Sequence, residues 1–243
     1  MNAIVPAQLR AAAATTELRP LVRIVIVGHV DHGKSTLIGR LLFETNSLPD
    51  GKLEQLKAVS ARRGMPFEWS FVLDALQTER DQNITIDTSQ IRFRTRSRDF
   101  ILIDAPGHAE FLRNMITGAA QADAAILVVD ATEGVRDQTR RHGYLLQLLG
   151  IQQVVVVINK MDRIDYDATR FREIETEITD YLKSLGLTPT EVIPVSARDG
   201  VGITEHTYTA EWYRPTLVEA LDRLSPDRMM PESRHSENRR HVG

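Results

Sequence analysis

The sequence contains no cysteine. This absence excludes disulfide bonds and every metal site built on thiolates, and it agrees with a reducing compartment. Long hydrophobic runs are also missing, because no apolar stretch approaches the roughly 18 residues of a membrane-spanning helix. The first twenty residues are rich in alanine but lack the continuous apolar segment of a secretory signal. We therefore expect a cytoplasmic protein with no membrane partner.

A large excess of charge of one sign is absent as well. The formal net charge is -3, which argues against general binding to nucleic acid or to a membrane surface. Hydrophobic residues make up 42% and charged residues 26% of the 243 residues, proportions that are ordinary for a globular protein. This length allows one large domain or two small ones, with a core of useful size.

Apolar, β-branched runs alternate with amphipathic segments along the chain. The runs predict buried strands at 21–27, 100–104, 124–130, 154–159 and 191–196. The segments between them predict helices at 34–44, 109–118, 137–149, 169–185 and 215–224. A further strand at about 89–96 should pair antiparallel with 99–104. The fold class is therefore α/β, with a mostly parallel six-stranded sheet flanked by helices on both faces.

The same pattern predicts the domain boundaries. Residues 1–20 form an N-terminal extension, and residues 21–224 form the folded domain. Residues 45–80 add a polar, helix-prone insert after the first helix. Residues 225–243 are polar, contain proline and show no periodicity, so we expect a disordered tail.

The segment "GHVDHGKS" (28–35) fits the phosphate-binding pattern G-x-x-x-x-G-K-[ST], with a strand before it and a helix after it. The glycines let backbone N–H groups turn toward phosphate oxygens, and the helix N-terminus favours negative charge. Lys34 should reach the β- and γ-phosphates, and Ser35 should ligate Mg²⁺. The expected phosphate-binding residues are Gly28, His29, Val30, Asp31, His32, Gly33, Lys34, Ser35 and Thr36. The loop alone is compatible with ATP or GTP.

The tetrapeptide "NKMD" (159–162) follows a predicted buried strand. Asp162 can accept hydrogen bonds from N1–H and the amine of guanine, whereas adenine would leave the carboxylate unpaired. Asn159 can bond the base edge and connect loops, and the Lys160 stem can lie across the base. The motif therefore favours GTP over ATP.

The tripeptide "SAR" (196–198) also follows a predicted strand. Small residues there would let the backbone N–H of Ala197 approach the guanine oxygen. The expected residues are Ser196, Ala197 and Arg198. Because many strands end in Ser-Ala, this motif carries weight only together with "NKMD" and the phosphate loop.

The segment "DAPGH" (104–108) ends another predicted strand. Asp104 can hold Mg²⁺ through water, and the N–H of Gly107 can meet the γ-phosphate. His108 would point toward the attacking water, although a histidine after such a turn can also be a surface residue. With Lys34 and Thr85, Gly107 and His108 form the expected catalytic group.

The segment "ERDQNITID" (79–87) should close on the metal ion. Thr85 is the expected ligand, although "NITID" could also simply begin a strand; the two readings are compatible. Order in such a loop depends on the γ-phosphate, which makes it a switch. The expected cofactors are therefore GTP or GDP and Mg²⁺, with Ser35, Thr85 and Asp104 as metal ligands.

These motifs, "GHVDHGKST", "ITID", "DAPGHAEFLRNMITGAAQAD" and "NKMD", together resemble the translation-factor class of GTPases, typified by elongation factor Tu. "FVLDALQTERDQNITID" and the insert before it resemble elongation factor 1-alpha and the GTPase subunit of bacterial ATP sulfurylase (sulfate adenylyltransferase). "TRRHGYLLQLLGIQQVVVVINKMD" and "EWYRPTLVEALDRL" look most like the ATP sulfurylase subunit. That resemblance implies GTP hydrolysis coupled to sulfate activation, with the ATP sulfurylase catalytic subunit as partner.

The resemblance also implies individual roles. His108 is similar to the water-positioning histidine of the family, Val30 and Ile84 match the apolar pair that gates it, and Asp31 matches a loop aspartate near a monovalent-cation site. The chain departs from the family at Asn83, where glycine is usual. No alternating strand pattern of the family's β-barrel domains follows residue 224, which puts the partner in question. The alternative is a stand-alone translation-type GTPase acting on RNA, the ribosome or a private partner.

For three further features we prefer a structural or solvent-exposed role to a functional one. Alternation in "IRFRTRSRDF" puts Arg92, Arg94, Arg96 and Arg98 on one face of a strand, where charge deters edge pairing. Trp69 and Phe71 should anchor the insert against the sheet. The segment 140–142 ("RRH") is expected to be surface charge on a helix.

Overall fold

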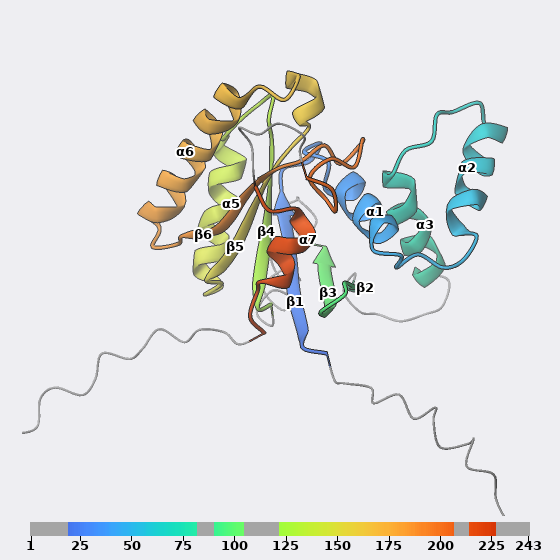
Figure 1. Cartoon of the computed structure of the whole chain (residues 1–243), viewed down its shortest axis with the longest axis horizontal. Coiled ribbons are helices and arrows are strands. Elements are labelled where there is room, and N and C mark those ends of the chain that lie inside the picture. The colour runs from blue at the N-terminus through green and yellow to red at the C-terminus, as the bar shows by residue number, and fades with distance from the viewer. Residues whose placement is uncertain (1–18, 82–89, 105–121, 207–213, 227–243) are drawn as a thin grey trace, which may run out of the picture.

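The computed structural model describes residues 19–81, 90–104, 122–206 and 214–226 (Figure 1). Within these ranges, six strands form one sheet in the order β2-β3-β1-β4-β5-β6. The strands are β1 (Leu21–Gly28), β2 (Gln90–Arg94), β3 (Asp99–Asp104), β4 (Ala124–Asp130), β5 (Gln153–Asn159) and β6 (Pro189–Pro194). Neighbouring strands are parallel except for β2 and β3, which are antiparallel. The predicted α/β class and the antiparallel edge strand are confirmed.

Four of the described helices lie within two residues of the predicted ranges, and two more form in the insert that was expected to be helix-prone. They are α1 (Lys34–Glu44), α2 (Lys52–Arg62), α3 (Ser70–Asp81), α5 (Asp137–Leu148), α6 (Ala168–Ser184) and α7 (Leu217–Asp222), with a 3-10 turn at Met161–Ile164. The helix expected at 109–118 lies outside the described residues. No helix in the described ranges is both long and apolar enough to cross a bilayer.

The hydrophobic core lies on both faces of the sheet. One cluster joins α1, α3 and α7 to the sheet, and the other joins α5 and α6 to the opposite face. All seven residues of β4 are buried, which is why the central strands read as continuous apolar runs. Each buried isoleucine, leucine or valine side chain in these strands contributes about 1.5–3 kcal/mol by leaving water.

The strand order determines where a ligand can bind. From β1 the chain passes through the edge strand β2 to β3 on one side of β1, and then crosses to β4 on the other side. The carboxyl end of β1 is therefore a topological switch point, where open α/β sheets bind ligands. The phosphate-binding pattern begins at this end of β1, at Gly28.

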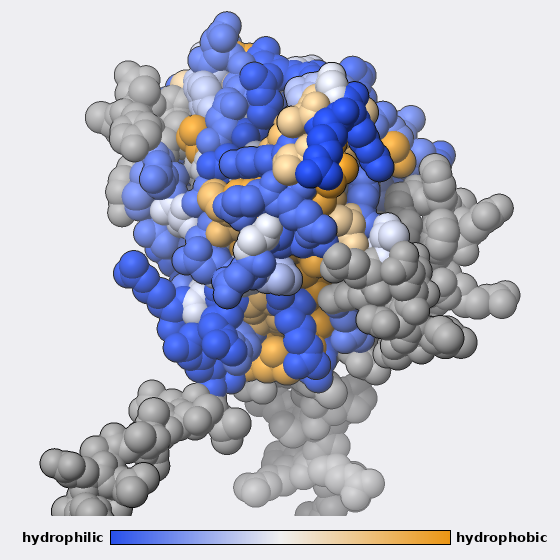
Figure 2. Space-filling view, turned by 90° about the vertical axis from the view of Figure 1, so that its right-hand side faces the viewer, coloured by the Kyte–Doolittle hydropathy of each residue, from blue (hydrophilic) through white to orange (hydrophobic). Residues whose placement is uncertain are grey.

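The insert forms α2 and α3 at one end of the molecule, where α3 packs beside α1 and α2 lies on the far side of α3 (Figure 1). The Trp69 ring lies 5.0 Å from the Phe43 ring of α1 and 5.2 Å from the Phe67 ring, measured between centroids. Trp69 thus anchors the insert, but its ring contacts lie on helix α1, whereas the sequence predicted an anchor against the sheet. Figure 2 shows this side of the molecule as mostly hydrophilic, with small apolar areas between polar side chains.

The structure corrects two expectations about charged residues. Strand β2 ends at Arg94, so only Arg92 and Arg94 share its exposed face. Arg98 lies in the following turn, where its Nε donates a 2.9 Å hydrogen bond to the carbonyl oxygen of Asp222. His142, expected on the surface with its arginine neighbours, is only 8% exposed. Its position on α5 turns it toward the protein interior while the adjacent Arg141 is exposed.

The ends of the folded part are held by specific hydrogen bonds. Arg19 donates from Nη1 to the carbonyl oxygen of Thr95 at 3.0 Å. At the other end, the backbone N–H of Ser225 donates to Oε1 of Gln153 at 2.8 Å. Residues just outside the expected domain, Arg19 before residue 21 and Ser225 after residue 224, therefore also bond to the folded part.

Candidate nucleotide-binding site

The phosphate loop (residues 28–35) connects β1 directly to α1. Gly33 precedes the helix with φ +84°, a conformation that glycine adopts without steric cost. A Cβ atom on Gly33 would also lie 2.5 Å from Nδ2 of Asn159. Two independent constraints therefore require glycine at this position, and the loop's N–H groups lead into the positive end of α1.

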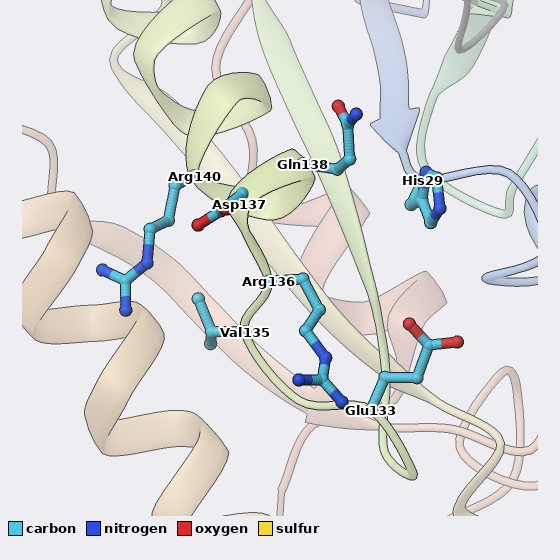
Figure 3. Close-up of a pocket in the computed structure, with 7 residues that line it drawn as sticks. All are labelled: His29, Glu133, Val135, Arg136, Asp137, Gln138 and Arg140. Atoms are coloured by element: carbon cyan, nitrogen blue, oxygen red, sulfur yellow. The ribbon is translucent and has the colours of Figure 1, made fainter.

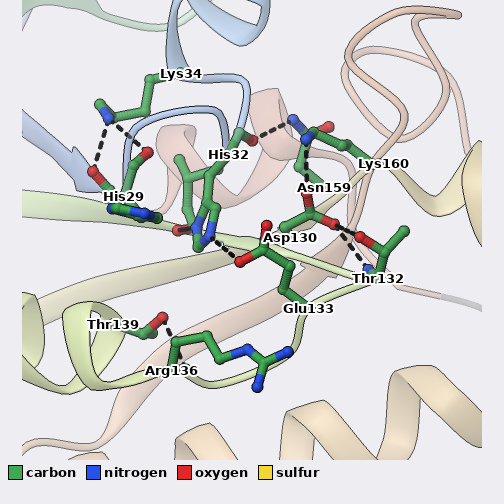
Figure 4. Close-up of polar contacts among 12 residues, drawn as sticks. His29, His32, Lys34, Asp130, Thr132, Glu133, Arg136, Thr139, Asn159 and Lys160 are labelled. Carbon is green, nitrogen blue, oxygen red and sulfur yellow. Dashed lines mark hydrogen bonds and ion pairs between the residues drawn. The ribbon is translucent and has the colours of Figure 1, made fainter.

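Lys34 is held inside this loop (Figure 4). Its Nζ donates hydrogen bonds to the carbonyl oxygens of Gly28 at 2.7 Å and His29 at 2.9 Å. Burial lowers the pKa of Lys34, and the nearby carboxylates of Asp104 and Asp31 oppose that shift. An ammonium group has three donors, so one donor beyond these two bonds can meet a phosphate oxygen.

Asp104 ends β3 close enough to Lys34 for their charges to interact. Its Oδ1 atom is buried and has no hydrogen-bond partner within the part of the chain that the structure describes. Burial raises the pKa of this carboxyl, and Lys34 opposes the shift. A buried carboxylate oxygen with an unused lone pair suits a hard cation or its bound water.

Asn159, at the end of β5, connects two loops. Its Nδ2 donates to the carbonyl oxygen of His32 at 2.9 Å, and its Oδ1 accepts from the N–H of Ala197 at 3.0 Å. Asn159 is only 2% exposed, so loss of either bond would leave a buried polar group unpaired. The phosphate loop and the SAR segment are thereby brought together.

Asp162 and Ser196 form the second link of the site. The Ser196 hydroxyl donates to Oδ1 of Asp162 at 2.8 Å and also contacts Oδ2 of Asp199 at 3.2 Å. Ser196 is fully buried, whereas Asp162 is partly exposed. We call residues 196–204 the base-recognition loop, because this bond places its first residue beside the carboxylate expected to bind guanine.

Lys160 is fixed by a partner that the sequence analysis did not identify. Its Nζ lies 2.6 Å from Oδ2 of Asp130, and Oδ1 of Asp130 accepts from the N–H and the hydroxyl of Thr132. Burial acts to raise the pKa of Asp130, but the bonds from Lys160 and Thr132 outweigh it and hold that pKa below its usual value. For the pairing of Lys160 with Asp130, the sequence offered one signal, an aspartate at the end of a predicted strand.

The remaining predicted residues divide between the interior and the surface. His32 is fully buried, with Nδ1 3.1 Å from the carbonyl oxygen of Val128 and Nε2 3.6 Å from Oε2 of Glu133. Its ring thus packs inward, while its carbonyl oxygen accepts the hydrogen bond from Asn159. Val30, Asp31 and Arg198 are exposed, and His29, Ser35 and Thr36 are partly buried. Thr85, Gly107 and His108 lie outside the described residues.

A cavity of about 440 Å³ adjoins the phosphate loop (Figure 3). Its wall combines one residue of that loop with the β4–α5 connection and the first turn of α5. The lining residues are His29, Glu133, Val135, Arg136, Asp137, Gln138 and Arg140. Acidic and basic groups are mixed here, so the cavity does not favour one sign of ligand charge.

Comparisons with known proteins agree with this geometry. Residues 19–227 match the model of the elongation factor Tu GTP binding domain. The chain is 46% identical over 207 residues to elongation factor 1-alpha of Thermococcus sibiricus and of Pyrococcus furiosus. Each match covers 85% of this chain and 48% of the relative. The chain therefore spans about half the length of the curated relatives it matches.

Solved structures show the same fold. The structure of Sup35 complexed with GDP is 28% identical, with a TM-score of 0.58 over 88% of this chain and 48% of that one. The Saccharomyces cerevisiae Ski7 GTPase-like domain bound to GTP has a TM-score of 0.67 over 84% of this chain and 49% of that one. At 22% identity the Ski7 match supports the fold alone.

Proposed function

The chain belongs to the elongation factor Tu GTP-binding domain family. On this basis we propose that it is a GTP-hydrolysing switch that acts on a component of the translation machinery. Binding of GTP by a translation-factor-like GTPase domain follows from the family itself. Hydrolysis by this chain, the metal ion and the partner are the parts that we propose.

The observation that carries this function is the double hydrogen bond of Asn159. Through it, the carbonyl oxygen of His32 in the phosphate loop is tied to the N–H of Ala197 in the base-recognition loop. One nucleotide could thus contact the phosphate loop and, at its other end, Asp162. Because a carboxylate at the base edge matches guanine and leaves an unpaired charge with adenine, GTP is the better ligand.

The residues present fit a magnesium ion. Asp104 supplies a buried carboxylate oxygen without a protein partner, and Ser35, the second residue of α1, carries a hydroxyl. No group of three or more His, Asp or Glu side chains that could hold a metal occurs among the described residues. A magnesium ion needs no such group, because it is held by one or two protein oxygens together with phosphates and water. When bound, it would neutralise charge on the β- and γ-phosphates.

The chain's own groups would then act by position and charge. Lys34 would direct its remaining donor at a phosphate oxygen, which stabilises charge that develops during transfer. His108 would orient the attacking water, and Thr85 and Gly107 would sense the γ-phosphate; these three roles remain predictions from the sequence. Phosphoryl transfer needs little covalent help, so unassisted turnover should be slow.

The comparisons favour a translation-type partner over sulfate activation. The relatives reported above are elongation factors 1-alpha, and the solved Sup35 structure is 28% identical. They give no support to a relationship with the ATP sulfurylase GTPase subunit or to its catalytic subunit as partner. We therefore adopt the alternative drawn from the sequence, a translation-factor-like GTPase acting on RNA, the ribosome or a private partner, and of these we propose the ribosome.

The test measures binding and hydrolysis separately. Displacement of a fluorescent GDP analogue should be efficient with GTP and GDP and at least about 10³-fold weaker with ATP, given the unpaired carboxylate. Phosphate release from GTP should then be followed with the protein alone, with ribosomes, and with an ATP sulfurylase catalytic subunit. Stimulation by ribosomes alone supports the proposal. Stimulation only by the sulfurylase subunit would overturn the choice of partner, and equal binding of ATP would overturn the function.

A further inference from the structure

Arg40 belongs to α1, the helix that follows the phosphate loop, and lies six residues after Lys34. Its side chain contacts both the insert and the base-recognition loop and is 18% exposed. A mostly buried arginine requires partners for its charge and its N–H groups. Its partners come from all three elements, and they carry the inference that follows.

The first set of contacts is with the base-recognition loop. Nη1 of Arg40 donates to the carbonyl oxygen of Arg198 at 3.4 Å, a long hydrogen bond. The backbone of Gly200 then lies directly against the guanidinium, because a Cβ atom on Gly200 would overlap Nη2, Cζ and Nε of Arg40. Gly200 also has φ +88°, a backbone conformation that favours glycine.

Glu44, one helical turn further along α1, holds Arg40 and the far end of the same loop. Its Oε1 accepts from Nε of Arg40 at 2.8 Å and lies 2.7 Å from Nη2. Its Oε2 accepts from the hydroxyl of Thr204 at 3.0 Å. The Arg40–Glu44 pair therefore contacts the loop near its beginning, at Arg198 and Gly200, and at its end, at Thr204.

The insert contributes an aromatic contact to this pair. The Cζ atom of Arg40 lies 4.7 Å from the centroid of the Trp69 ring and 5.8 Å from that of Phe43. Contacts of this kind between a cation and an aromatic ring are attractive, and they restrict the guanidinium. Lysine could keep the charge at this position but could not supply the planar fork of donors.

The restrained loop carries two groups of the base site. Ala197, whose N–H is bonded to Asn159, immediately precedes Arg198, and the Ser196 hydroxyl contacts Asp162. We propose that Arg40 is a positioning residue for guanine recognition, through which the insert holds the base-recognition loop against the nucleotide. This inference rests on the proposed function, because it concerns how the same site selects its base.

The proposal predicts a loss that depends on the base. Guanine and hypoxanthine carry the O6 oxygen that the SAR backbone would approach, whereas adenine does not. Displacement of Arg198 and Gly200 should therefore weaken GDP and IDP more than ADP. A role for Arg40 in general stability alone would change the affinities for all three nucleotides by the same factor.

The experiment compares the full chain with Arg40→Ala, Arg40→Lys and Arg214→Ala. Arg214 is a matched control, because its Nη2 donates to Glu175 at 2.8 Å and its Cζ lies 5.7 Å from the Phe171 ring. Dissociation constants for GDP, IDP and ADP are measured by titration calorimetry or, for weak ligands, by competition. Thermal melting of each variant checks that it is folded.

In Arg40→Ala we expect the dissociation constants of GDP and IDP to rise about tenfold, as for the loss of one hydrogen bond, and that of ADP to stay within about twofold. Arg40→Lys should change in the same direction, and Arg214→Ala should match the wild type.

An unchanged GDP affinity in folded Arg40→Ala, an equal loss for ADP, or the same loss in Arg214→Ala would overturn the proposal. If Arg40→Ala does not fold, Arg40→Lys and Trp69→Leu decide by the same criteria. A wild-type protein without preference for GDP over ADP would instead contradict the proposed function.

Discussion

Nδ2 of Asn159 donates a 2.9 Å hydrogen bond to the carbonyl oxygen of His32, although the two residues are 127 positions apart in the chain. The same amide accepts from the N–H of Ala197. One side chain at the end of β5 thus joins the phosphate loop to the base-recognition loop. Both bonds are buried, so the alignment of the two loops depends strongly on this residue.

We expect Asn159→Ala to weaken GDP binding about 100-fold and to lower the free energy of unfolding by about 1–3 kcal/mol, because it leaves two buried partners unpaired. Asn159→Asp keeps an acceptor for Ala197 but loses the donor to His32, so its binding defect should be of similar direction. Titration with GDP and urea unfolding measure the two effects. Gln147→Ala, an exposed change on α5, serves as control. Wild-type affinity in Asn159→Ala would show that the two loops are aligned by other contacts.

Asp162→Asn should shift the preference from GTP to xanthosine triphosphate. The change replaces an acceptor with a donor opposite the base edge, and xanthine presents an oxygen where guanine has its amine. Loss of the matching pairs should reduce GTP affinity by about 10² or more. Asp165→Asn, an exposed change of the same type three residues away, should leave both affinities unchanged. Equal GTP affinity in Asp162→Asn and the wild type would mean that this carboxylate does not contact the base.

His108→Ala should lower the rate of GTP hydrolysis about 10²-fold while leaving GTP binding nearly intact, because a group that positions the attacking water acts mainly in the transition state. Single-turnover hydrolysis and equilibrium titration separate the two quantities. His206→Ala is a suitable control, since His206 is not among the predicted site residues and its Nδ1 lies 3.1 Å from the carbonyl oxygen of Arg214. Hydrolysis at the wild-type rate would remove His108 from the catalytic group.

His142 predicts a pH dependence of stability. Burial, followed by the charge of Lys34 and the nearby His29 and His32, lowers the pKa of His142 to about 4, whereas a bond to the Gln138 backbone opposes the shift. Between the ordinary value of about 6.5 and this value, the unfolded chain binds a proton that the folded chain does not. The contribution of His142 to the free energy of unfolding should therefore be fully present above about pH 6.5. Below that pH the free energy of unfolding should fall by up to about 1.4 kcal/mol per pH unit.

His142→Gln should flatten the pH dependence of stability between pH 7 and pH 5, measured by urea unfolding. Part of the slope should persist, because burial also lowers the pKa of His32. The exposed change Gln147→Ala, on the same helix, should retain the slope of the wild type. A wild-type slope in His142→Gln would show that His142 does not bind a proton on unfolding in this range.

Local pattern was sufficient to predict the strands, four of the described helices and the main motifs. The apolar runs became β1 and β3 to β6, and the antiparallel edge strand became β2. The motif "NKMD" begins at the last residue of β5, as predicted. These features could be predicted because strand and helix periodicity, and the glycines that a phosphate loop requires, are properties of neighbouring residues.

Other features were decided only in three dimensions. The burial of His142, the pairing of Lys160 with Asp130, and the contact of Arg40 with Arg198 all depend on how elements pack. The last of these joins residues 158 positions apart. No local pattern specifies which distant side chain will face a given one, because that depends on the relative placement of whole helices and strands. The sequence by itself therefore determined the nucleotide-binding motifs and their order, and the tertiary structure determined the contacts that align them.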